Sequence, residues 1–431
     1  MSFDHLSTPP RKIAVIGAGI SGMGAAFALS GTHRVTLFES EKRLGGHART
    51  VMAGKRGDQP VDTGFIVFNH VNYPNLVELF QELDVPTAKS QMSFGVSVRD
   101  GWLDYALNDL DSLFAQRSNL VNPKFLAMVR DIFRFNKHAQ NTVRPGMTVR
   151  DLIATLGLGS YFRDYYLTPF SGAIWSTPKE KILDFPADAL IRFFANHHLL
   201  HHTGQHQWHT VQGGSVEYVS RLETRLRADG VALRLGTPIK SVSRHPAGVT
   251  VRAWGVEPEL FDEVIFATHS DDSLKMLEDA TGDERRDLGA IAYQPNDIVL
   301  HCDESLMPAN RKVWSSWTYT EPSDMSSDVI DLSYWMNALQ PIPQSDPHFV
   351  TLNSRRPIRE ELIYDQVSLR HPVYNAEAFK AQARVAEWNG ANNTWFCGAW
   401  MKNGFHEDGL SSALDVVDAI KRIAAAKVAA E

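Results

Sequence analysis

Near the start of the chain, two short hydrophobic runs are separated by a stretch of small residues. Residues 13–16 and 34–38 have the length and apolar content of buried β-strands. Between them, residues 17–28 include four glycines and four alanines, which would let a helix pack closely against a sheet. The pattern therefore predicts a strand, a turn, a helix and a second strand.

The glycine spacing in this unit predicts a dinucleotide site. Gly17, Gly19 and Gly22 form a GxGxxG pattern, and Glu39 ends the second strand twenty-two residues after the first glycine. In such a unit the first glycine permits the tight turn, the second admits a pyrophosphate, and the third allows close helix packing. The acidic residue accepts hydrogen bonds from the ribose hydroxyls. The helix N-terminus also offers unpaired N–H groups to phosphates.

The rest of the chain alternates between helical and strand patterns. Residues 85–204 are mostly helical and rich in aromatics, whereas residues 231–268 alternate as strands do. We therefore predict an α/β fold with a discontinuous, Rossmann-like nucleotide-binding domain, made of residues 1–84, 205–268 and 386–431. The second, substrate-binding domain is predicted to be inserted, α+β and partly helical, made of residues 85–204 and 269–385.

Composition narrows the class of protein. A chain of 431 residues predicts two domains, and its net charge of −7 argues against a nucleic-acid partner. Cys302 and Cys397 are the only cysteines, and both lie in apolar stretches, as free thiols of a reducing compartment do. The chain shows neither a signal-peptide pattern nor a run long enough to span a bilayer. We expect a cytoplasmic enzyme.

One segment could touch a membrane surface. Residues 123–137 predict an amphipathic helix in which Arg130, Arg134 and Lys137 repeat at helical spacing. We expect Leu126, Val129 and Phe133 to mark a separate apolar face. Such a face either packs on a core, which is the more common case, or lies in a lipid interface.

Four later features distinguish a flavin protein from other dinucleotide binders. They are Arg43 with Gly45 and Gly46, the strands 238–242 and 262–268, and the C-terminal elements 396–398 and 407–409. With these features in this order, the chain resembles the flavin-containing amine oxidase and phytoene desaturase superfamily along nearly its whole length. The resemblance implies FAD as cofactor.

The resemblance also implies which residues contact FAD. The ADP portion would be held by Gly17, Gly19, Ile20, Ser21, Gly22 and Glu39. Arg43, Gly45 and Gly46 would follow the pyrophosphate and ribityl chain, and Val242 would contact adenine through its backbone. The flavin end would be lined by Thr63, Gly64, Gly398, Asp408 and Gly409.

A narrower resemblance is to bacterial flavoproteins that are commonly encoded beside cyclopropane-fatty-acid-synthase-like methyltransferases. The similar segments are residues 62–69, 293–296, 300–303 and 404–413. That association implies desaturation or another oxidation of a methyl-branched or unsaturated fatty acyl chain, on the way to furan fatty acids. It also implies a long-chain acyl lipid as substrate, with the acyl chain held in phospholipid. Peripheral contact with the inner face of the membrane and a methyltransferase partner are further implications of this resemblance.

Two departures from the amine oxidases concern the reacting centre. Those enzymes usually carry a lysine in a strand near the flavin N5, and the comparable position here is His301. They also place an aromatic cage residue just before the C-terminal helix, where this chain has His406. His406, His301 and Glu407 are therefore the candidate proton acceptors, since an unperturbed histidine titrates near neutrality. The alternatives are a core histidine for His301 and a turn or helix-cap carboxylate for Glu407.

Two other functions stay open from the sequence. The chain could be a conventional FAD-dependent amine oxidase, or a non-catalytic flavin-binding partner of a lipid methyltransferase. The histidines from His197 to His209 include helical i, i+4 pairs, but without a third ligand we predict no metal site. Several aromatic side chains could line an apolar tunnel or belong to an ordinary core: Phe170, Trp175, Trp314, Trp317, Tyr334 and Trp335.

Overall fold

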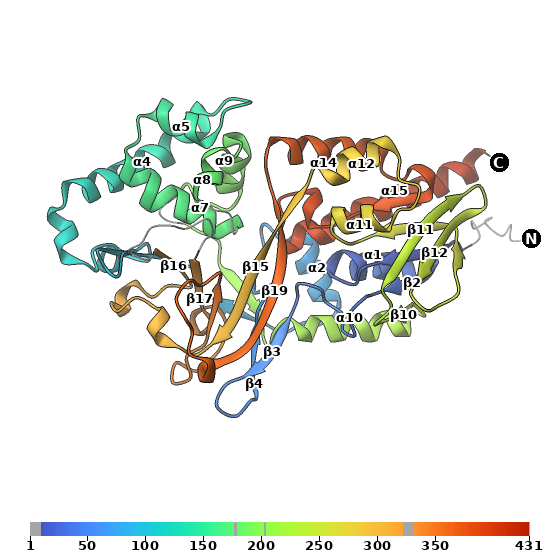
Figure 1. Cartoon of the computed structure of the whole chain (residues 1–431), viewed down its shortest axis with the longest axis horizontal. Helices are drawn as coiled ribbons and strands as arrows, with labels where there is room; N and C mark the ends of the chain where they lie inside the picture. The colour runs from blue at the N-terminus through green and yellow to red at the C-terminus, as the bar shows by residue number, and fades with distance from the viewer. Residues whose placement is uncertain (1–9, 176–178, 202–203, 322–330, 431) are drawn as a thin grey trace, which may run out of the picture.

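A computed structural model describes residues 10–175, 179–201, 204–321 and 331–430. The chain forms two halves, and α1 and α15, from near the two ends of the described chain, lie on the same half (Figure 1). The helices α4 and α5 lie at the opposite end of the molecule.

The first half is centred on a five-stranded parallel sheet. Its strand order is β10-β2-β1-β14-β20, with β1 (Lys12–Ile16), β2 (Arg34–Phe38), β10 (Ala232–Arg234), β14 (Glu263–Phe266) and β20 (Thr394–Phe396). Side chains alternate along each strand: Ile13 and Val15 enter one buried cluster, whereas Ala14 and Ile16 enter another. A parallel sheet that buries both faces needs a layer on each side.

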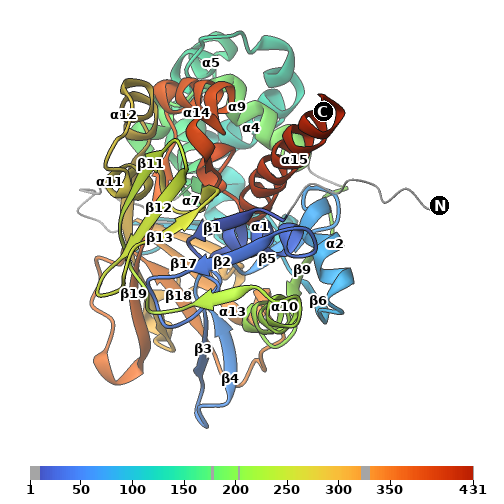
Figure 2. The same ribbon diagram turned by 90° about the vertical axis from the view of Figure 1, so that its right-hand side faces the viewer.

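Helices cover one face of this sheet, and a second sheet with further helices covers the other. The first layer contains α1 (Ile20–Ser30), α2 (Pro74–Glu82), α10 (Val216–Ala228) and α15 (His406–Ala430). The other contains β11 (Ile239–His245), β12 (Gly248–Ala253), β13 (Glu259–Phe261), α11 (Ser270–Met276), α12 (Gly282–Gly289) and α14 (Ala376–Trp388). Figure 2 shows β1 and β2 between β11–β13 and α1. The predicted α/β fold class is confirmed.

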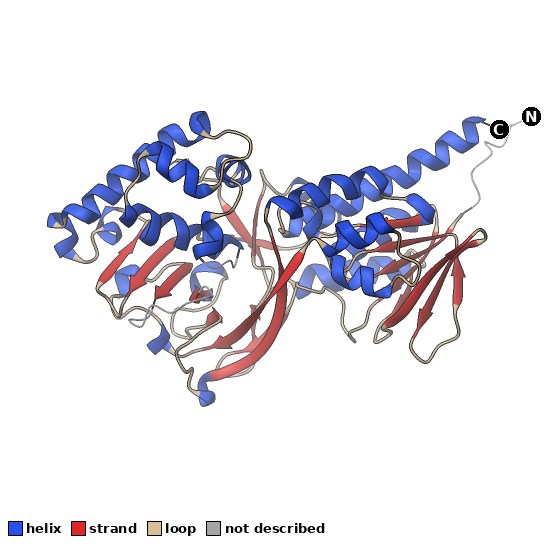
Figure 3. Ribbon diagram, turned by 45° about the horizontal axis from the view of Figure 1, so that its top comes forward, coloured by secondary structure: helices blue, strands red, loops and turns tan. Residues whose placement is uncertain are grey.

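The second half is a seven-stranded mixed sheet with helices packed beside it (Figure 3). Its order is β19-β15-β18-β17-β16-β7-β8. The strands are β7 (Phe94–Val98), β8 (Leu103–Ala106), β15 (Ala292–His301), β16 (Trp317–Glu321), β17 (Asp331–Trp335), β18 (Phe349–Leu352) and β19 (Ile363–Val373). Because β7 pairs in parallel with β16, segments more than two hundred residues apart share one sheet.

Helices of residues 110–196 bury a separate, aromatic-rich cluster against β7 and β8. They are α3 (Leu110–Leu113), α4 (Pro123–Thr142), α5 (Val149–Leu156), α6 (Ser160–Phe162), α7 (Thr168–Trp175), α8 (Lys179–Leu183) and α9 (Ala187–Asn196), and α13 (Met336–Leu339) lies after β17. Small strands join the halves: β3 (Thr50–Ala53) with β4 (Gln59–Asp62), and β9 (Trp208–Val211) between β5 (Val67–Asn69) and β6 (Thr87–Ser90). None of the described helices combines the length and apolar character needed to cross a membrane.

Two local expectations are wrong. The helix α9 ends at Asn196, and His198 has a positive φ of 55°, so the predicted i, i+4 histidine pairs do not form on a helix; His202 lies outside the described residues. On α4 the buried residues are Phe125, Met128, Asp131, Phe135 and Ala139, whereas Leu126 and Phe133 are exposed. Leu126 and Phe133 therefore share the solvent side with the basic residues, whereas Val129 packs against the buried cluster.

Candidate active site

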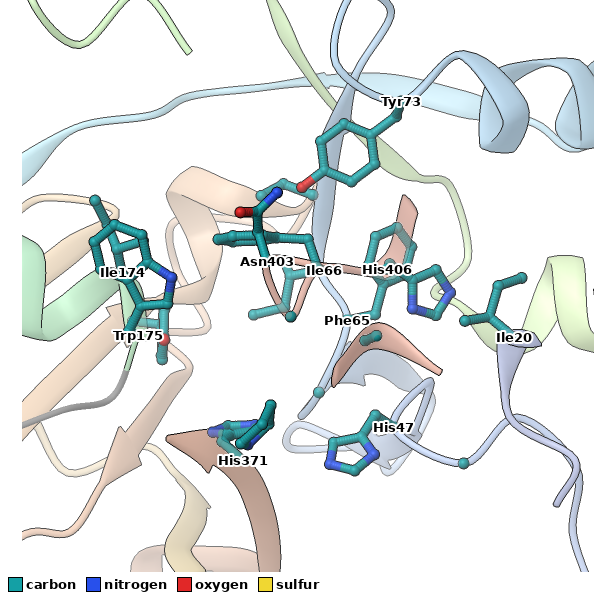
Figure 4. Close-up of a pocket in the computed structure, with 18 of the residues that line it drawn as sticks. Ile20, His47, Phe65, Ile66, Tyr73, Ile174, Trp175, His371, Asn403 and His406 are labelled. Atoms are coloured by element: carbon teal, nitrogen blue, oxygen red, sulfur yellow. The ribbon is translucent and has the colours of Figure 1, made fainter. Parts of the chain in front are cut away.

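A cavity of about 1060 Å³ lies between the two halves and is lined by residues from both. Its volume is at the upper end of small-molecule sites, which are about 300–1,000 Å³. One end is formed by the glycine turn after β1, and the other by aromatic and aliphatic side chains of the second half. In Figure 4, Ile20 marks the first end, and Ile174 and Trp175 lie across the view from it.

The glycine turn has the backbone geometry of a phosphate site. Gly17 has a φ of +97°, and its N–H donates to the carbonyl of Phe38 at 2.8 Å. A Cβ atom at Gly22 would lie 1.8 Å from the carbonyl oxygen of Gly17, so only glycine lets α1 start this close to the turn. A Cβ at Gly19 would meet no atom within 4 Å, and this residue lines the cavity. The backbone is thus open to a ligand at the N-terminus of α1, where anions bind.

The acidic residue and the second glycine pair complete this end. The Glu39 carboxylate lines the cavity and accepts a hydrogen bond from the Ala18 N–H at 2.7 Å. The Gly45 N–H donates to the Ala18 carbonyl at 2.8 Å, and a Cβ at Gly46 would lie 3.0 Å from the Cα of Gly19. The two glycine turns therefore touch, and the residues present fit the ADP portion of FAD.

Most of the residues predicted to contact the cofactor line the cavity: Gly17, Gly19, Ile20, Ser21, Glu39, Gly45, Gly46, Thr63, Gly64 and Gly398. Arg43 lies outside it, because its guanidinium donates to the carbonyl oxygens of Gly46 and Ala48 and so supports the turn from behind. Gly22 and Gly409 permit close packing instead: a Cβ at Gly409 would lie 2.9 Å from the Ser21 hydroxyl.

Val242 and Asp408 are also behind the cavity wall. Val242 is fully buried in the core between the parallel sheet and β11–β13. The Asp408 carboxylate accepts from the Phe405 N–H at 2.9 Å, and burial raises the pKa of this group to about 6. These residues hold the C-terminal helix and the small sheet in place around the cavity.

Of the three candidate proton acceptors, His406 alone lines the cavity. Its ring stacks on Phe65 with centroids 3.9 Å apart, and its Nε2 lies 2.7 Å from the Tyr218 hydroxyl. Burial lowers the pKa of His406 to about 3, so the imidazole is neutral near pH 7. It can accept a proton, but it binds that proton weakly.

His301 and Glu407 are engaged elsewhere. The His301 Nδ1 accepts from the Asp303 N–H at 3.1 Å and its Nε2 lies 2.7 Å from the Thr351 hydroxyl, so both ring nitrogens have partners within the sheet. The Glu407 carboxylate accepts from the N–H groups of Asn75 and Leu76 at the start of α2, at 3.1 and 2.9 Å. These are the core-histidine and helix-cap arrangements that we gave as alternatives.

The sequence interpretation missed a group of histidines at the middle of the cavity. The His47 ring centroid lies 5.7 Å from that of His269 and 5.6 Å from that of His371, and all three line the cavity. Figure 4 shows His47 and His371 facing the same space. Burial lowers the pKa of His269 and His371 to about 3 and also lowers that of His47. Two could have been found, since His47 follows the Gly45–Gly46 turn and His269 follows a parallel strand at its carboxyl end.

A chain of amides fixes the tautomer of His371. The Asp297 backbone N–H, which can only donate, donates to Asn353 Oδ1 at 3.0 Å, so the Asn353 amide nitrogen faces Asn296 Oδ1 at 2.9 Å. The Asn296 amide nitrogen then donates to His371 Nδ1 at 3.0 Å. A neutral imidazole whose Nδ1 accepts carries its proton on Nε2. His371 is therefore a hydrogen-bond donor at Nε2.

Asp62 joins the two halves below the cavity. Its buried carboxylate accepts from the Thr50 hydroxyl at 2.6 Å, the Ser215 N–H at 2.9 Å and the Gln340 amide at 2.9 Å. Burial raises the pKa of Asp62 to about 6, and these hydrogen bonds oppose that effect. Gln340 belongs to the second half. The network therefore fixes Thr63 and Gly64, which follow Asp62, relative to the second half.

The far end of the cavity, which we name the apolar arm, is formed by side chains of the second half. They are Phe94, Leu107, Phe170, Ile174, Trp175, Phe193, Ile298, Trp317, Tyr334, Leu339, Val350 and Leu352. Among the described lining residues only Glu39 and Asp272 carry carboxylates; Glu39 is at the glycine turn and Asp272 pairs with Arg370. A tunnel and an ordinary core both stayed open for six aromatic side chains; Phe170, Trp175, Trp317 and Tyr334 line the arm, whereas Trp314 and Trp335 pack around Phe349.

Comparisons with known proteins agree with this architecture. The sequence model of the family described as flavin containing amine oxidoreductase matches residues 20–327. An L-amino-acid oxidase of Gloydius blomhoffii is 45% identical over 49 residues, which is 11% of this chain and 10% of that protein. The match thus spans only a tenth of that curated relative.

Solved structures resemble the whole chain at low sequence identity. A CLA-producing fatty acid isomerase from P. acnes superposes with a TM-score of 0.67 at 15% identity, covering 95% of this chain and 99% of the other. Cyclohexylamine oxidase from Brevibacterium oxydans IH-35A gives 0.68 at 14% identity, covering 96% and 100%. A putrescine oxidase variant gives 0.69 at 14% identity, covering 98% and 99%. At these identities the likeness establishes the fold.

Proposed function

The chain belongs to the flavin-containing amine oxidoreductase family, and we propose that this FAD-dependent oxidoreductase oxidises a long fatty acyl chain, most simply by desaturation. The observation that carries the proposal is the apolar arm. It presents a dozen aromatic and aliphatic side chains to the ligand and no carboxylate among the described residues. A site of this kind binds an apolar chain through surface burial but offers no counter-charge to an ammonium group.

The edge of the cavity suits the other end of such a substrate. Lys89 lines the cavity and is exposed, and it can attract a carboxylate or phosphate while the chain lies in the arm. A structural relative whose title names a fatty acid isomerase further supports this substrate class.

The roles of the residues follow from where they lie. FAD, when bound, accepts a hydride from the substrate carbon. The turns at Gly17–Gly19 and Gly45–Gly46 would hold its ADP portion, and the apolar arm orients the chain and excludes water. Desaturation also removes a proton from the neighbouring carbon. His406 is the proposed acceptor because, of the three candidates that the sequence offers, it alone lines the cavity, and it is neutral; the Nε2 of the neighbouring His371 already carries a proton.

The test is anaerobic reduction of the purified holoenzyme. Fatty acids and phospholipids with unsaturated or methyl-branched chains should bleach the visible absorbance of the flavin, and an amine panel should leave it unchanged. Mass spectrometry should then find a product two hydrogens lighter than the acyl substrate. Bleaching by an amine but by no lipid, with peroxide released once oxygen is admitted, would instead establish an amine oxidase.

A further inference from the structure

The solvent side of α4 carries both apolar and basic residues. Leu126, Arg130, Phe133 and Lys137 follow one another at spacings of four, three and four, so they form a single stripe along the helix. All four are exposed, opposite the buried Phe125, Met128 and Phe135. Packing against the core therefore does not account for Leu126, and Phe133, which has a contact of its own, still remains 54% exposed.

The segment before α4 extends this surface. Leu110 at the start of α3 is 76% exposed, and Val121 at the end of a 3₁₀ turn (Arg117–Val121) is 81% exposed. Leu120 beside it is half exposed. We call the set Leu110, Leu120, Val121, Leu126, Arg130, Phe133, Arg134 and Lys137 the α4 face. The helix α4 lies at the end of the molecule opposite α1 and α15 (Figure 1).

The charge of this region is opposite to that of the whole protein. Residues 110–144, which span the α4 face, contain six lysines or arginines and two carboxylates, Asp111 and Asp131, in a chain whose net charge is −7. Asp111 pairs with Arg117 and Lys312. Asp131 is buried and accepts from Arg130 and from the Gly159 N–H. Among the described carboxylates, none forms an ion pair with Arg134 or Lys137. Two exposed cations on the α4 face therefore have no acidic partner within the described chain.

We propose that the α4 face docks the protein on an anionic lipid surface. Leucine, valine and phenylalanine side chains would enter the interface, and the arginines and lysine would contact the lipid phosphates. A second copy of the chain fits less well, because a symmetric contact would bring the same cations together. An anionic bilayer matches both the apolar and the basic side chains of the α4 face, because its interior is apolar and its headgroup surface is negatively charged.

The position of the face connects docking to the cavity. Leu107 lines the apolar arm, is exposed at 36%, and precedes Leu110 by three residues. Its N–H donates to the carbonyl of Phe94, which also lines the arm. An acyl chain leaving the membrane at the α4 face would thus meet the arm at Leu107. This last step rests on the proposed function, whereas docking itself does not.

The experiment is flotation of the holoenzyme with vesicles of phosphatidylcholine alone or with one third phosphatidylglycerol. The wild type should float with the anionic vesicles, less in high salt, and little with neutral ones. Leu126→Ser with Phe133→Ser should abolish flotation, and Arg134→Gln with Lys137→Gln should weaken it about fivefold for each removed charge. Flavin content and circular dichroism report whether each variant is folded.

Matched controls change the same chemistry elsewhere. Trp254→Ser with Val256→Ser removes two exposed apolar side chains from the β12–β13 turn, and Lys421→Gln with Arg422→Gln removes two exposed charges from α15. These variants should float like the wild type. Equal flotation of the α4 variants, no flotation of any protein, or a wild-type dimer that the α4 variants dissociate would each overturn the proposal. Normal docking without flavin bleaching by any lipid would refute the proposed function alone.

Discussion

At its two ends, the central cavity is built in different ways. The nucleotide end is mostly backbone and comes from residues 17–64, with short additions after β14 and β20. The apolar arm is made of side chains from several distant segments, including α7, β15 and β16–β18. A ligand held by backbone groups constrains the glycine positions tightly. A ligand held by apolar side chains constrains only the shape and volume of its site. The residues of the apolar arm can therefore change while those of the nucleotide end stay the same.

The strongest way to test this contrast is to change a single glycine at the nucleotide end. Gly22→Ala would bring a Cβ to 1.8 Å from the Gly17 carbonyl oxygen, so α1 or the turn must shift. Loss of one or two N–H contacts to phosphate, at about 1.5–3 kcal/mol each, would weaken FAD binding by on the order of a hundredfold. The visible absorbance of the purified variant and its FAD titration measure this effect.

Gly31→Ala is the matched control at the other end of the same helix. Gly31 has a φ of −73°, and a Cβ there would meet no atom within 4 Å. This variant should keep its full flavin content. Full flavin content in Gly22→Ala as well would show that the turn tolerates displacement and that the contrast between the two ends is wrong.

The second test breaks the network that holds the two ends together. Asp62→Ala leaves the Ser215 N–H and the Gln340 amide without their acceptor, which should lower the free energy of unfolding by about 4 kcal/mol. Chemical denaturation measures the loss. The control Asp58→Ala lies on the exposed β3–β4 turn and should change the free energy of unfolding by less than about 0.5 kcal/mol.

The same carboxylate predicts a dependence on pH. Because burial raises the folded-state pKa of Asp62 to about 6, the folded protein binds the proton more tightly than the unfolded chain. The protonated Asp62 carboxyl therefore stabilises the fold fully below the unfolded pKa of about 4, and this stabilisation is lost as pH rises through 6. Over that range the free energy of unfolding should fall by about 3 kcal/mol. The free energy of unfolding of the wild type minus that of Asp62→Asn should therefore decrease as pH rises from about 4 to above 6. A difference that grows with rising pH would contradict the sign.

These contrasts also explain how much the sequence predicted. The glycine pattern and Glu39 specify a local structure, so the Rossmann-like unit followed from spacing, whereas the other lining residues that we predicted came from the family resemblance. His371 could not be found this way, because it enters the cavity from the long strand β19, and only the pairing with β15 places it beside Asn296. Glu407 was misjudged for a related reason: its partners at the start of α2 are more than three hundred residues away.

The third test changes the apolar arm without touching the nucleotide end. Val350 is buried at the centre of β18 and lines the arm, so Val350→Phe should fill part of it, at a stability cost of about 1–3 kcal/mol. The KM for long acyl chains should rise about tenfold, since one or two methylenes of contact are lost. Flavin content should stay unchanged. Val350→Ala widens the arm, so it should not shift the preference toward shorter acyl chains. If Val350→Phe and Val350→Ala lose flavin equally, the apolar arm and the nucleotide end of the cavity are not independent.

The smallest effect concerns the amide relay behind His371. In Asn296→Asp the carboxylate can only accept, so the His371 proton should move to Nδ1 and leave Nε2 as an acceptor. Asn353→Asp should cause the same reversal from a residue that does not contact His371, because it forces the Asn296 amide to turn. Turnover should fall about fivefold, the value of one neutral hydrogen bond of about 1 kcal/mol. Nitrogen-15 shifts of the imidazole report the tautomer directly.

His301 serves as the internal reference for that measurement. Its Nδ1 accepts from a backbone N–H, so it should keep its proton on Nε2 in the wild type and in both variants. A wild-type His371 protonated on Nδ1 would contradict the relay. If both variants reverse the tautomer while flavin content and the KM for acyl chains stay constant, the loss of turnover belongs to the proton on Nε2. The centre of the cavity would then depend on single hydrogen positions, unlike the backbone turn at one end and the apolar arm at the other.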